Sequence, residues 1–395
     1  DRRAMRKRIR ALVEDYGLEV DPDARVEELS VGEQQRVEIL KALYRGAEVL
    51  ILDEPTAVLV EQEVEALFST VRALREQGKA VVFITHKLHE ALEICDRITV
   101  LRKGRKVGTL QASEATETQL AELMVGREVV FTVAPEPLES EGRVLLKVEG
   151  LSAVDDRGVP AVRDVTLEVQ DHEILGIAGV QGNGQKELVE AICGLRRAKA
   201  GRVWIGEREL TGESPSRLAV QGLVHIPEDR HLRGLILTFS VEENAILGQH
   251  RQPRFAVGPW AQKRRAITAY AGELVQKFSV SVPSLSAPVR TLSGGNQQRL
   301  ILARELSRSP QVIVAVQPTR GLDVGGMEFV WEQFLRARKA GAGILLVSMD
   351  LDEVMMLSDR IAVMYQGEIV AVLKRGEASK RELGLLMLRG KDAVA

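Results

Sequence analysis

The sequence is poor in the residues that build disulfide frameworks, metal clusters and membrane spans. Only two of its 395 residues are cysteines, Cys95 and Cys193, and neither has metal-ligand spacing around it. The simplest interpretation is two small core residues in a reducing cytosol. The longest apolar runs, such as residues 343–347, are far shorter than the roughly 20 residues of a transmembrane helix, and no signal peptide is recognisable. We therefore expect a protein without a membrane segment of its own.

An excess of either charge is also lacking. The chain carries 54 Lys and Arg against 56 Asp and Glu, so no long-range attraction to nucleic acid or anionic lipid is expected. Aromatic residues are scarce, and no Tyr, Phe or Trp occurs between Gly142 and Gly184. The first residue is Asp1 rather than Met and lies inside a charged helical pattern, so we expect the protein to begin upstream.

A tandem repeat is the most informative feature that is present. The motif Leu-Ser-x-Gly-x-Gln-Gln-Arg begins at Leu29 and returns at Leu292, an offset of 263 residues. The same offset aligns a Pro-Thr pair and an Asp-Arg-Ile triplet, so the copies stay in register over roughly 70 residues. It also pairs three reactive residues of the first copy with three that lack their chemistry: Asp53 with Val316, Glu54 with Gln317, and His86 with Met349.

The repeat also predicts the domain boundaries. We expect the later part of a first domain over residues 1–133, a Pro- and Glu-rich linker over residues 134–142, and a second domain over residues 143–395. If the copies are equally long, about 120 residues of the first domain precede Asp1. Both copies alternate short apolar runs with helical spacing, which predicts an α/β fold with functional residues at the carboxyl ends of parallel strands.

A glycine-rich loop joins an apolar strand over residues 173–178 to a helix over residues 187–192. This context is typical of a phosphate-binding loop, because backbone N–H groups and a helix N-terminus together attract an anion. The pattern departs from the usual Gly-Lys-Ser/Thr ending, so the hydroxyl that would hold Mg²⁺ is missing. The alternative is a strand-to-helix turn without a ligand. The candidate nucleotide-binding residues of this region are Gly179, Gly182, Asn183, Gly184, Gln185, Lys186 and Glu187.

The first copy carries an acidic pair and a histidine where the second has neither. Asp53 ends an apolar run and could hold a Mg²⁺-bound water, while Glu54 could orient or deprotonate an attacking water. His86 follows a second apolar run, where an imidazole could contact a γ-phosphate. The simpler alternatives are a helix-capping acidic pair and an ordinary surface or core histidine.

The two Leu-Ser-x-Gly motifs begin helices. A serine hydroxyl beside exposed amides at a helix start forms a second kind of anion site. One such motif alone would be a helix cap and no more, but each copy is followed by Gln-Gln-Arg and then by the acidic-pair position. The candidate nucleotide-binding residues are Ser30 and Gly32 in the first copy, and Ser293, Gly294 and Gly295 in the second.

At these residues the chain closely resembles the ATP-binding-cassette (ABC) ATPases. The resemblance implies two tandem P-loop NTPase cassettes, the first incomplete, with ATP and Mg²⁺ as cofactors. Leu292–Gln298 resembles the cassette signature motif and Asp53-Glu54 the Walker B pair. His86 resembles the switch histidine, and Asp323 the aspartate of the D-loop. Glu228 stands at or near the glutamine of the Q-loop, which faces the permease in this family.

The resemblance further implies composite sites, each formed by the phosphate loop and Walker B pair of one cassette and the signature of another. One site would use Asp53, Glu54 and His86 with Ser293-Gly294-Gly295. The other would use the loop over residues 179–186 with Ser30 and Gly32, and nearly every catalytic group in it is replaced. We therefore expect ATP hydrolysis at one site, a structural or regulatory second site, and little ATPase activity from this chain alone.

The fused cassettes are similar to importers of simple sugars and nucleosides. That resemblance implies a protein at the cytoplasmic face of the cell membrane, attached only through permease subunits and, through them, served by an extracytoplasmic solute-binding protein. Self-association of cassettes and no nucleic-acid partner are expected. The alternatives are a non-transport cassette protein, which the short acidic linker disfavours, and a catalytically inactive, truncated cassette protein.

Overall fold

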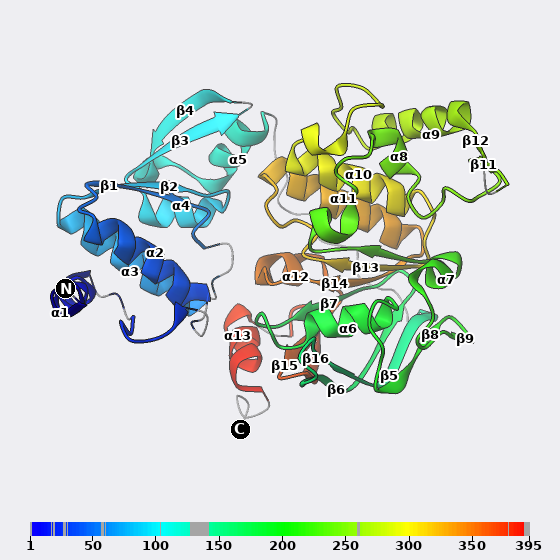
Figure 1. Cartoon of the computed structure of the whole chain (residues 1–395), viewed down its shortest axis with the longest axis horizontal. Coiled ribbons are helices and arrows are strands. Elements are labelled where there is room, and N and C mark those ends of the chain that lie inside the picture. Colours follow the sequence, from blue (N-terminus) through cyan, green and yellow to red (C-terminus); the bar gives the residue numbers. More distant parts are fainter. Residues whose placement is uncertain are drawn as a thin grey trace. The chain divides into compact units, whose positions relative to one another are not determined.

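The computed structural model describes residues 2–16, 18, 20–26, 29, 31–56, 59, 61–102, 104–126, 142–258, 261–377 and 379–390. The chain forms two compact units, Asp1–Val130 and Phe131–Ala395 (Figure 1). Apart from Gly142, the predicted linker lies outside the described residues, so its bounds stay a prediction. Among the described residues, no helix is both long and apolar enough to span a bilayer.

Unit 1 places its larger helices against one face of a parallel strand pair, β1 (Val49–Asp53) with β2 (Ala80–Ile84). A core of Leu50, Phe68, Leu74 and their neighbours joins strands to helices. An antiparallel pair, β3 (Arg97–Arg102) with β4 (Arg105–Gln111), forms a separate sheet. The helices are α1 (Arg2–Tyr16), α2 (Val31–Tyr44), α3 (Glu61–Glu76), α4 (Leu88–Ile94), the 3₁₀ turn η2 (Ala112–Glu114) and α5 (Glu117–Val125).

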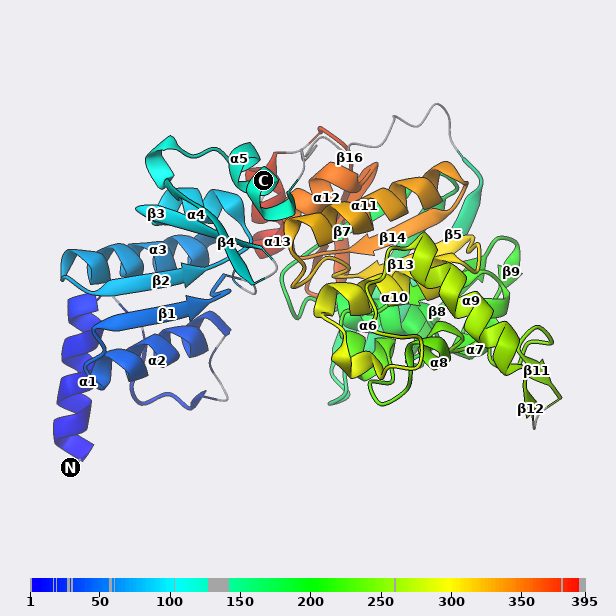
Figure 2. The ribbon, with the colours of Figure 1, turned by 90° about the horizontal axis from the view of Figure 1, so that it is seen from above.

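Unit 2 is built on a six-stranded sheet in the order β10-β13-β14-β7-β15-β16, parallel except for β16 (Figure 2). Its strands are β7 (Ile174–Ala178), β10 (Leu223–Ile226), β13 (Val312–Val316), β14 (Gly343–Val347), β15 (Arg360–Tyr365) and β16 (Glu368–Lys374). An antiparallel sheet contains β5 (Val144–Val154), β6 (Pro160–Gln170), β8 (Ala200–Ile205) and β9 (Arg208–Glu209). A short hairpin pairs β11 (Ala256–Val257) with β12 (Ala261–Gln262).

The helices of unit 2 pack on both faces of the six-stranded sheet, which is why β7, β13 and β14 are buried along their whole length. One core contains α6 and the antiparallel sheet, and another contains α8 to α11. The helices and helical turns are α6 (Gln185–Ile192), α7 (Pro215–Val220), η3 (Arg230–Gly234), α8 (Val241–Ala245), α9 (Arg264–Lys277), η4 (Val289–Thr291), α10 (Gly294–Leu306), α11 (Val324–Lys339), α12 (Leu351–Leu357) and α13 (Lys380–Arg389).

The sequence offset of 263 residues is also a structural offset. Added to the bounds of β1, α3, β2, α4, β3 and β4, it gives the bounds of β13, α11, β14, α12, β15 and β16 without exception. The predicted α/β fold and the duplication are therefore confirmed. The strand and helix ends expected from the sequence differ from these bounds by one or two residues.

The two units differ in what covers their shared strands. In unit 2, β7 lies between β14 and β15 and is parallel to both. In the described part of unit 1, β2 and β3 belong to separate two-stranded sheets. Val49 is 57% exposed, whereas its counterpart Val312 is fully buried in the core formed with β5, β6 and α6. Ile51, Val82, Ile84 and Leu101 are exposed in the same way.

Candidate functional site

The acidic pair and the histidine of unit 1 come together at the carboxyl ends of two neighbouring strands. Asp53 is the last residue of β1, Glu54 follows it, and His86 follows β2. Because β1 and β2 are parallel and in register from Val49 to Asp53, their carboxyl ends meet at one edge. His86 Nδ1 lies 2.9 Å from Glu54 Oε1. The other carboxylate oxygen of Glu54 is buried and has no hydrogen-bond partner among the described protein atoms.

The backbone at Glu54 is held in an uncommon conformation. Its φ is +47°, a left-handed value that costs a residue with a side chain roughly 1 kcal/mol or more. Glu54 N donates to Ile84 O at 2.9 Å, which fixes the turn onto β2. Gln317 has the same φ of +47° and donates to Val347 O at 2.8 Å. The turn therefore has the same backbone in both units, and its side chain is a glutamate in unit 1 and a glutamine in unit 2.

The Pro-Thr pair after each turn is anchored from two helices. In unit 1, Gln35 Nε2 donates to Pro55 O at 2.6 Å, and Thr56 Oγ1 donates to Glu90 Oε2 at 2.6 Å. In unit 2 the corresponding bonds are Gln298 to Pro318 and Thr319 to Glu353, both 2.8 Å. Burial raises the pKa of Glu353 above its ordinary value, against the effect of hydrogen bonds from Ser348 and Trp331. The motif glutamines therefore tie the signature helix to the Walker B turn.

A pocket of unit 2 lies where β7, β10, β13 and β14 end. The glycine-rich loop forms one side and Val316, Gln317 and Met349 form another. Six of the predicted nucleotide-binding residues line this pocket: Gly179, Gly182, Gly184, Gln185, Lys186 and Glu187. The sequence prediction of a shared site is therefore consistent with the geometry. Pro227, Glu228 and Asp229 close a third side.

The loop has the backbone of an anion cradle but an altered set of side chains. Gly184 has φ +99°, and a Cβ there would meet Ala161 O at 2.0 Å, so only glycine fits. Gln185 Nε2 donates back to Val180 O at 3.0 Å. Lys186 lines the pocket, and its Nζ lies 3.6 Å from Asp156 Oδ2. The ammonium group of the loop therefore has a carboxylate of unit 2 as its partner.

The nucleotide-binding role expected of Asn183 stays a prediction, and Asn183 is absent from the lining of the pocket. Its side chain is turned away from the pocket: Nδ2 donates to Met364 O at 3.4 Å, and Oδ1 accepts from Gln366 N at 3.1 Å. An amide can bond to both a carbonyl and an N–H, and these two bonds connect the loop to the turn between β15 and β16.

The pocket is also lined by titratable residues that the sequence motifs did not indicate. Glu190 is buried on α6 and pairs with Arg196 and Arg233, each at 2.7 Å. His225, at the end of β10, lines the pocket. Burial, helped by the nearby Arg233, lowers the pKa of His225 to about 4, so this imidazole is neutral at physiological pH. Their positions follow from tertiary packing, and nothing in the local sequence marks them.

The signature of unit 2 begins α10 as expected. Ser293 is the N-cap and accepts a hydrogen bond from Asn296 Nδ2 at 2.9 Å, while Gly294 and Gly295 form the first turn. In unit 1, Gly32 lies in the first turn of α2, and Ser30 lies outside the described residues. Ser293 to Gly295 do not line the pocket of their own unit. Their nucleotide-binding role stays a prediction.

Asp323 acts as a helix cap in this structure. Its Oδ1 accepts from Gly326 N at 2.8 Å at the start of α11, and it does not line the pocket of unit 2. Its nucleotide-binding role stays a prediction. An aspartate at this position satisfies an otherwise unpaired helix N–H.

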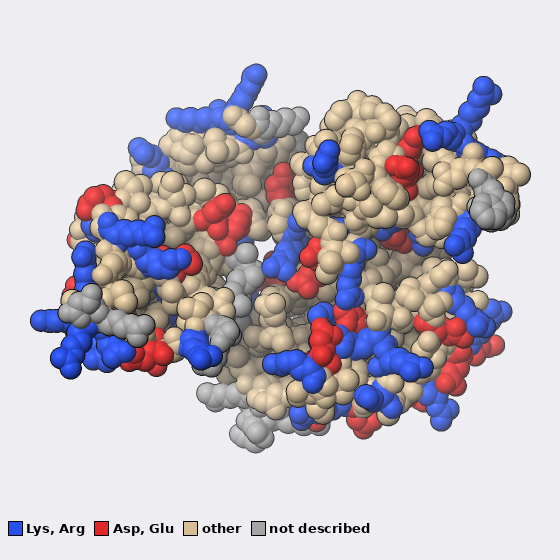
Figure 3. Space-filling view, in the orientation of Figure 1, with Lys and Arg blue, Asp and Glu red and all other residues tan. Residues whose placement is uncertain are grey.

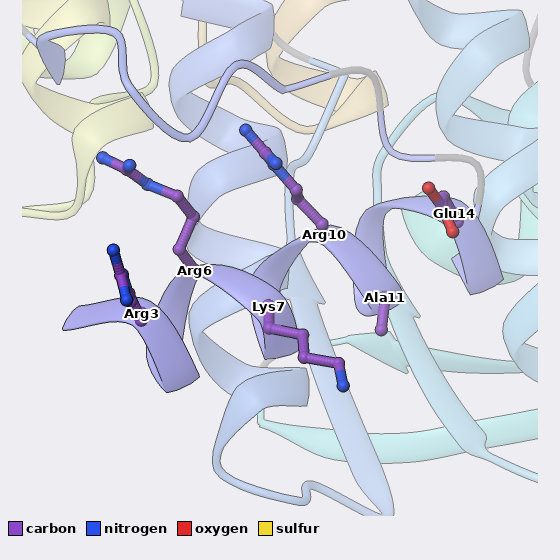
Figure 4. Close-up of a pocket in the computed structure, with 6 residues that line it drawn as sticks. All are labelled: Arg3, Arg6, Lys7, Arg10, Ala11 and Glu14. Atoms are coloured by element: carbon purple, nitrogen blue, oxygen red, sulfur yellow. The ribbon is translucent and has the colours of Figure 1, made fainter. Parts of the chain in front are cut away.

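Unit 1 has a further hollow that contains none of the motif residues. It runs along α1 and is lined by Arg3, Arg6, Lys7, Arg10, Ala11 and Glu14 (Figure 4). Lys and Arg side chains gather over this helix on the surface (Figure 3). Arg6 forms an ion pair with Asp23. Because its lining comes from one helix face, we do not assign the hollow to nucleotide.

No group of three or more His, Cys, Asp or Glu side chains in the described ranges could hold a metal ion by itself. A metal at Glu54 and Asp53 would therefore need ligands from water and phosphate in addition to the protein. That arrangement is usual for Mg²⁺, which keeps several waters and binds through one or two carboxylates and substrate phosphates.

Comparison with known proteins agrees with this geometry. The family described as ABC transporter matches residues 2–57 and 162–320. The chain belongs to this family. Among solved structures, it is similar to a nucleotide-free ATP-binding cassette from an ABC transporter, with a TM-score of 0.51 and 23% identity over 59% of this chain and 92% of that one. At this level of identity the likeness establishes the fold alone.

The similar curated proteins are longer than this chain. The glucose import ATP-binding protein of Haloferax volcanii is 47% identical over 98% of this chain and 71% of its own length. The nucleoside import ATP-binding protein of Lactococcus lactis is 41% identical, over 99% of this chain and 77% of its own length. The guanosine import ATP-binding protein of Bacillus subtilis is 43% identical, over 98% and 76%.

Proposed function

We propose that this chain is the ATP-binding and ATP-hydrolysing subunit of an importer for a simple sugar or a nucleoside. Its membership of the ABC transporter family supports the ATPase activity. The names of its relatives support import, and they include both glucose and nucleosides. The solute is selected by the permease and the solute-binding protein, so the chain itself carries the energy-coupling step.

Hydrolysis is assigned to the residues of unit 1. Glu54 orients or deprotonates the attacking water, and His86 contacts the γ-phosphate. The observation that carries this proposal is the 2.9 Å contact between His86 Nδ1 and Glu54 Oε1, because it holds the carboxylate at the strand ends.

Mg²⁺ fits unit 1 better than unit 2. Asp53 in unit 1 ends its strand with a carboxylate that can hold a Mg²⁺-bound water. When bound, Mg²⁺ neutralises charge that develops on the phosphates. In the pocket of unit 2, Val316 offers no oxygen and the loop offers no hydroxyl. We assign this pocket to a nucleotide that is bound and not hydrolysed.

The two signature motifs would then serve different nucleotide sites. Ser293, Gly294 and Gly295 are proposed to complete the site of Asp53, Glu54 and His86, and Ser30 and Gly32 to face the non-hydrolytic pocket. This division requires association of cassettes, as the family resemblance implies. It is a functional assignment that follows from which Walker B pair is intact.

A transmembrane permease is the proposed partner, and the cytoplasmic face of the membrane the proposed location. The segment that follows Glu228 exposes three large apolar side chains, Leu232 at 77%, Ile236 at 40% and Phe239 at 41%. Exposed apolar side chains grouped in this way are typical of a protein-binding surface. We assign the permease contact to this segment, with an extracytoplasmic solute-binding protein acting through the permease.

Reconstitution tests this function. The protein is combined with its permease and solute-binding protein in liposomes, and ATP hydrolysis is measured with a panel of simple sugars and nucleosides outside. One solute class is expected to stimulate hydrolysis and to accumulate inside. ATP hydrolysis that does not respond to any solute, together with ribosome or DNA binding, would favour the non-transport alternative.

The permease contact has its own control. Leu232→Ser is expected to weaken co-purification with the permease, while Val220→Ser, at an 80% exposed site on α7, is expected to leave it unchanged. Equal retention of the permease by both variants would contradict the assignment of this surface.

A further inference from the structure

A short segment of unit 2 separates its pocket from its signature motif. Pro227, Glu228 and Asp229 line the pocket, and so do Leu232 and Arg233. Arg230, in the middle of this wall, does not line the pocket. Its guanidinium instead reaches the first turn of α10 and the residue before Gly321. The wall therefore has a pocket side and a signature side.

Arg230 bridges two backbone carbonyls from motifs far apart in the sequence. Nη1 donates to Gly294 O at 2.9 Å, and Nη2 donates to Arg320 O at 3.1 Å. A Cβ at Gly294 would lie 3.2 Å from Nη1, and one at Gly321 would lie 3.3 Å from Nη2. Both glycines therefore leave the room that the planar guanidinium needs. Only arginine offers two diverging donors from one rigid group.

Further polar contacts make the same connection. His231 Nε2 lies 2.9 Å from Gln297 Oε1 on α10, and Glu228 forms an ion pair with Arg320. Asp229 accepts from the backbone N–H groups of His231 and Leu232 at 2.8 and 2.9 Å, which stiffens the turn. The wall is therefore joined to the signature helix α10 and to Arg320 by several polar contacts.

We propose that Arg230 is a positioning residue that transmits occupancy of the unit 2 pocket to the signature motif Ser293-Gly294-Gly295. The inference rests on the proposed assignment of that pocket to a nucleotide. The polyphosphate of an incoming nucleotide would act on the charged residues of this wall that line the pocket, because it repels the acidic Glu228 and Asp229 and attracts Arg233. Displacing this wall would shift Arg230, and with it the Gly294 carbonyl. The non-hydrolytic pocket would thus set the position of the signature that serves hydrolysis.

Hydrogen exchange of the chain provides the test, with ATP in excess EDTA as the probe. ATP is expected to slow exchange in the loop over residues 179–186 and to change exchange at residues 294–299 about fivefold, the lower end of usual coupling between sites. In Arg230→Gln the loop response is expected to remain and the response at residues 294–299 to disappear. Arg230→Lys keeps the charge but cannot bridge both carbonyls, so it should behave in the same way and also controls for folding.

Arg217→Gln is the matched control. Arg217 is a 65% exposed arginine of the same unit whose ion pair, with Glu213, is local. It should keep both responses. An undiminished response at residues 294–299 in both Arg230 variants would overturn the proposal, as would a loop response in the unaltered chain without any change there. If ATP protected neither region, the inference would fall, while the importer function would still be decided by solute-stimulated hydrolysis.

Discussion

His86 and Glu54 form a pair whose Nδ1–Oε1 distance is 2.9 Å, at the carboxyl ends of two parallel strands. Met349 and Gln317 stand at the equivalent strand ends of unit 2. Neither side chain can act as a base, as a carboxylate or an imidazole does. The backbone at the two sites is the same, with φ of +47° at Glu54 and at Gln317. The difference between the units is therefore one of side-chain chemistry on a shared turn.

Replacing His86 is expected to lower the rate of ATP hydrolysis without abolishing ATP binding. His86→Ala should reduce kcat of the transporter about 100-fold, the lower end of the usual contribution of such groups, and leave the Kd for ATP within a few-fold. Met349→Ala is the matched control and should leave kcat near its original value. Equal losses of kcat in the two variants would show that both sites hydrolyse ATP.

Removal of Mg²⁺ should separate the two sites. Binding of ATP in the pocket of unit 2 is expected to survive EDTA, because Val316 provides no carboxylate and the altered loop no hydroxyl for the ion. A fluorescent ATP analogue, titrated with and without EDTA into the chain carrying Asp53→Ala, measures this. A Kd that rises more than tenfold in EDTA would contradict a metal-independent pocket.

Acid should destabilise unit 2 before most carboxylates are protonated. In the folded state the pKa of His225 is about 4, below the ordinary value of 6.5. As the pH falls, this side chain therefore binds a proton in the unfolded chain at a higher pH than in the folded chain. The free energy of unfolding should therefore fall as pH drops from 6.5 to about 4, by at most roughly 3 kcal/mol from this group. Urea unfolding followed by tryptophan fluorescence reports on unit 2, because all three tryptophans lie there.

His225→Gln isolates that contribution. The variant has no titrating ring, so its unfolding free energy should depend less on pH between 6.5 and 4. The raised pKa of Glu353 acts in the opposite direction above pH 4.5, but it is common to both proteins and cancels in the difference. Parallel pH curves for the two proteins would mean that His225 does not titrate below its ordinary pKa.

Much of the fold could be predicted from the sequence because the repeat presents the same order of strands and helices in two different sequences. Residues that end strands, such as Asp53 and Val316, were predicted from apolar runs and turn residues alone. The Glu54–His86 contact also follows from this logic, since both lie after parallel strands. The family and the α/β fold are confirmed by comparison and structure.

Other parts of the site depend on side-chain packing that local patterns do not encode. Asn183 stands in a phosphate-loop motif, yet its amide bonds to the β15–β16 turn. Glu190 on α6 and His225 on β10 both line the pocket, although they come from elements that are far apart in the sequence. Arg230 gains its two carbonyl partners 64 and 90 residues further along the chain. These contacts are set by tertiary packing, so a local sequence pattern does not predict them.

One matched pair of substitutions tests whether β1 of unit 1 is more exposed to solvent than the equivalent strand β13 of unit 2. Val49→Thr places a hydroxyl where the side chain is 57% exposed, whereas Val312→Thr places it where the side chain is fully buried. The first should change the unfolding free energy by less than about 0.5 kcal/mol, and the second should cost about 1–3 kcal/mol. Calorimetry of the two variants measures this, and a larger loss for Val49→Thr would show that its strand is covered in solution.

The assignment of hydrolysis to a single Walker B pair is tested most directly by substituting Glu54 and Gln317, which stand at the two equivalent turns. Steady-state ATP hydrolysis is measured for the transporter carrying Glu54→Gln and, separately, Gln317→Ala. We expect Glu54→Gln to lower kcat about 100-fold or more while ATP still binds, and Gln317→Ala to leave kcat within about twofold. Substantial hydrolysis in Glu54→Gln, or its loss in Gln317→Ala, would contradict the account.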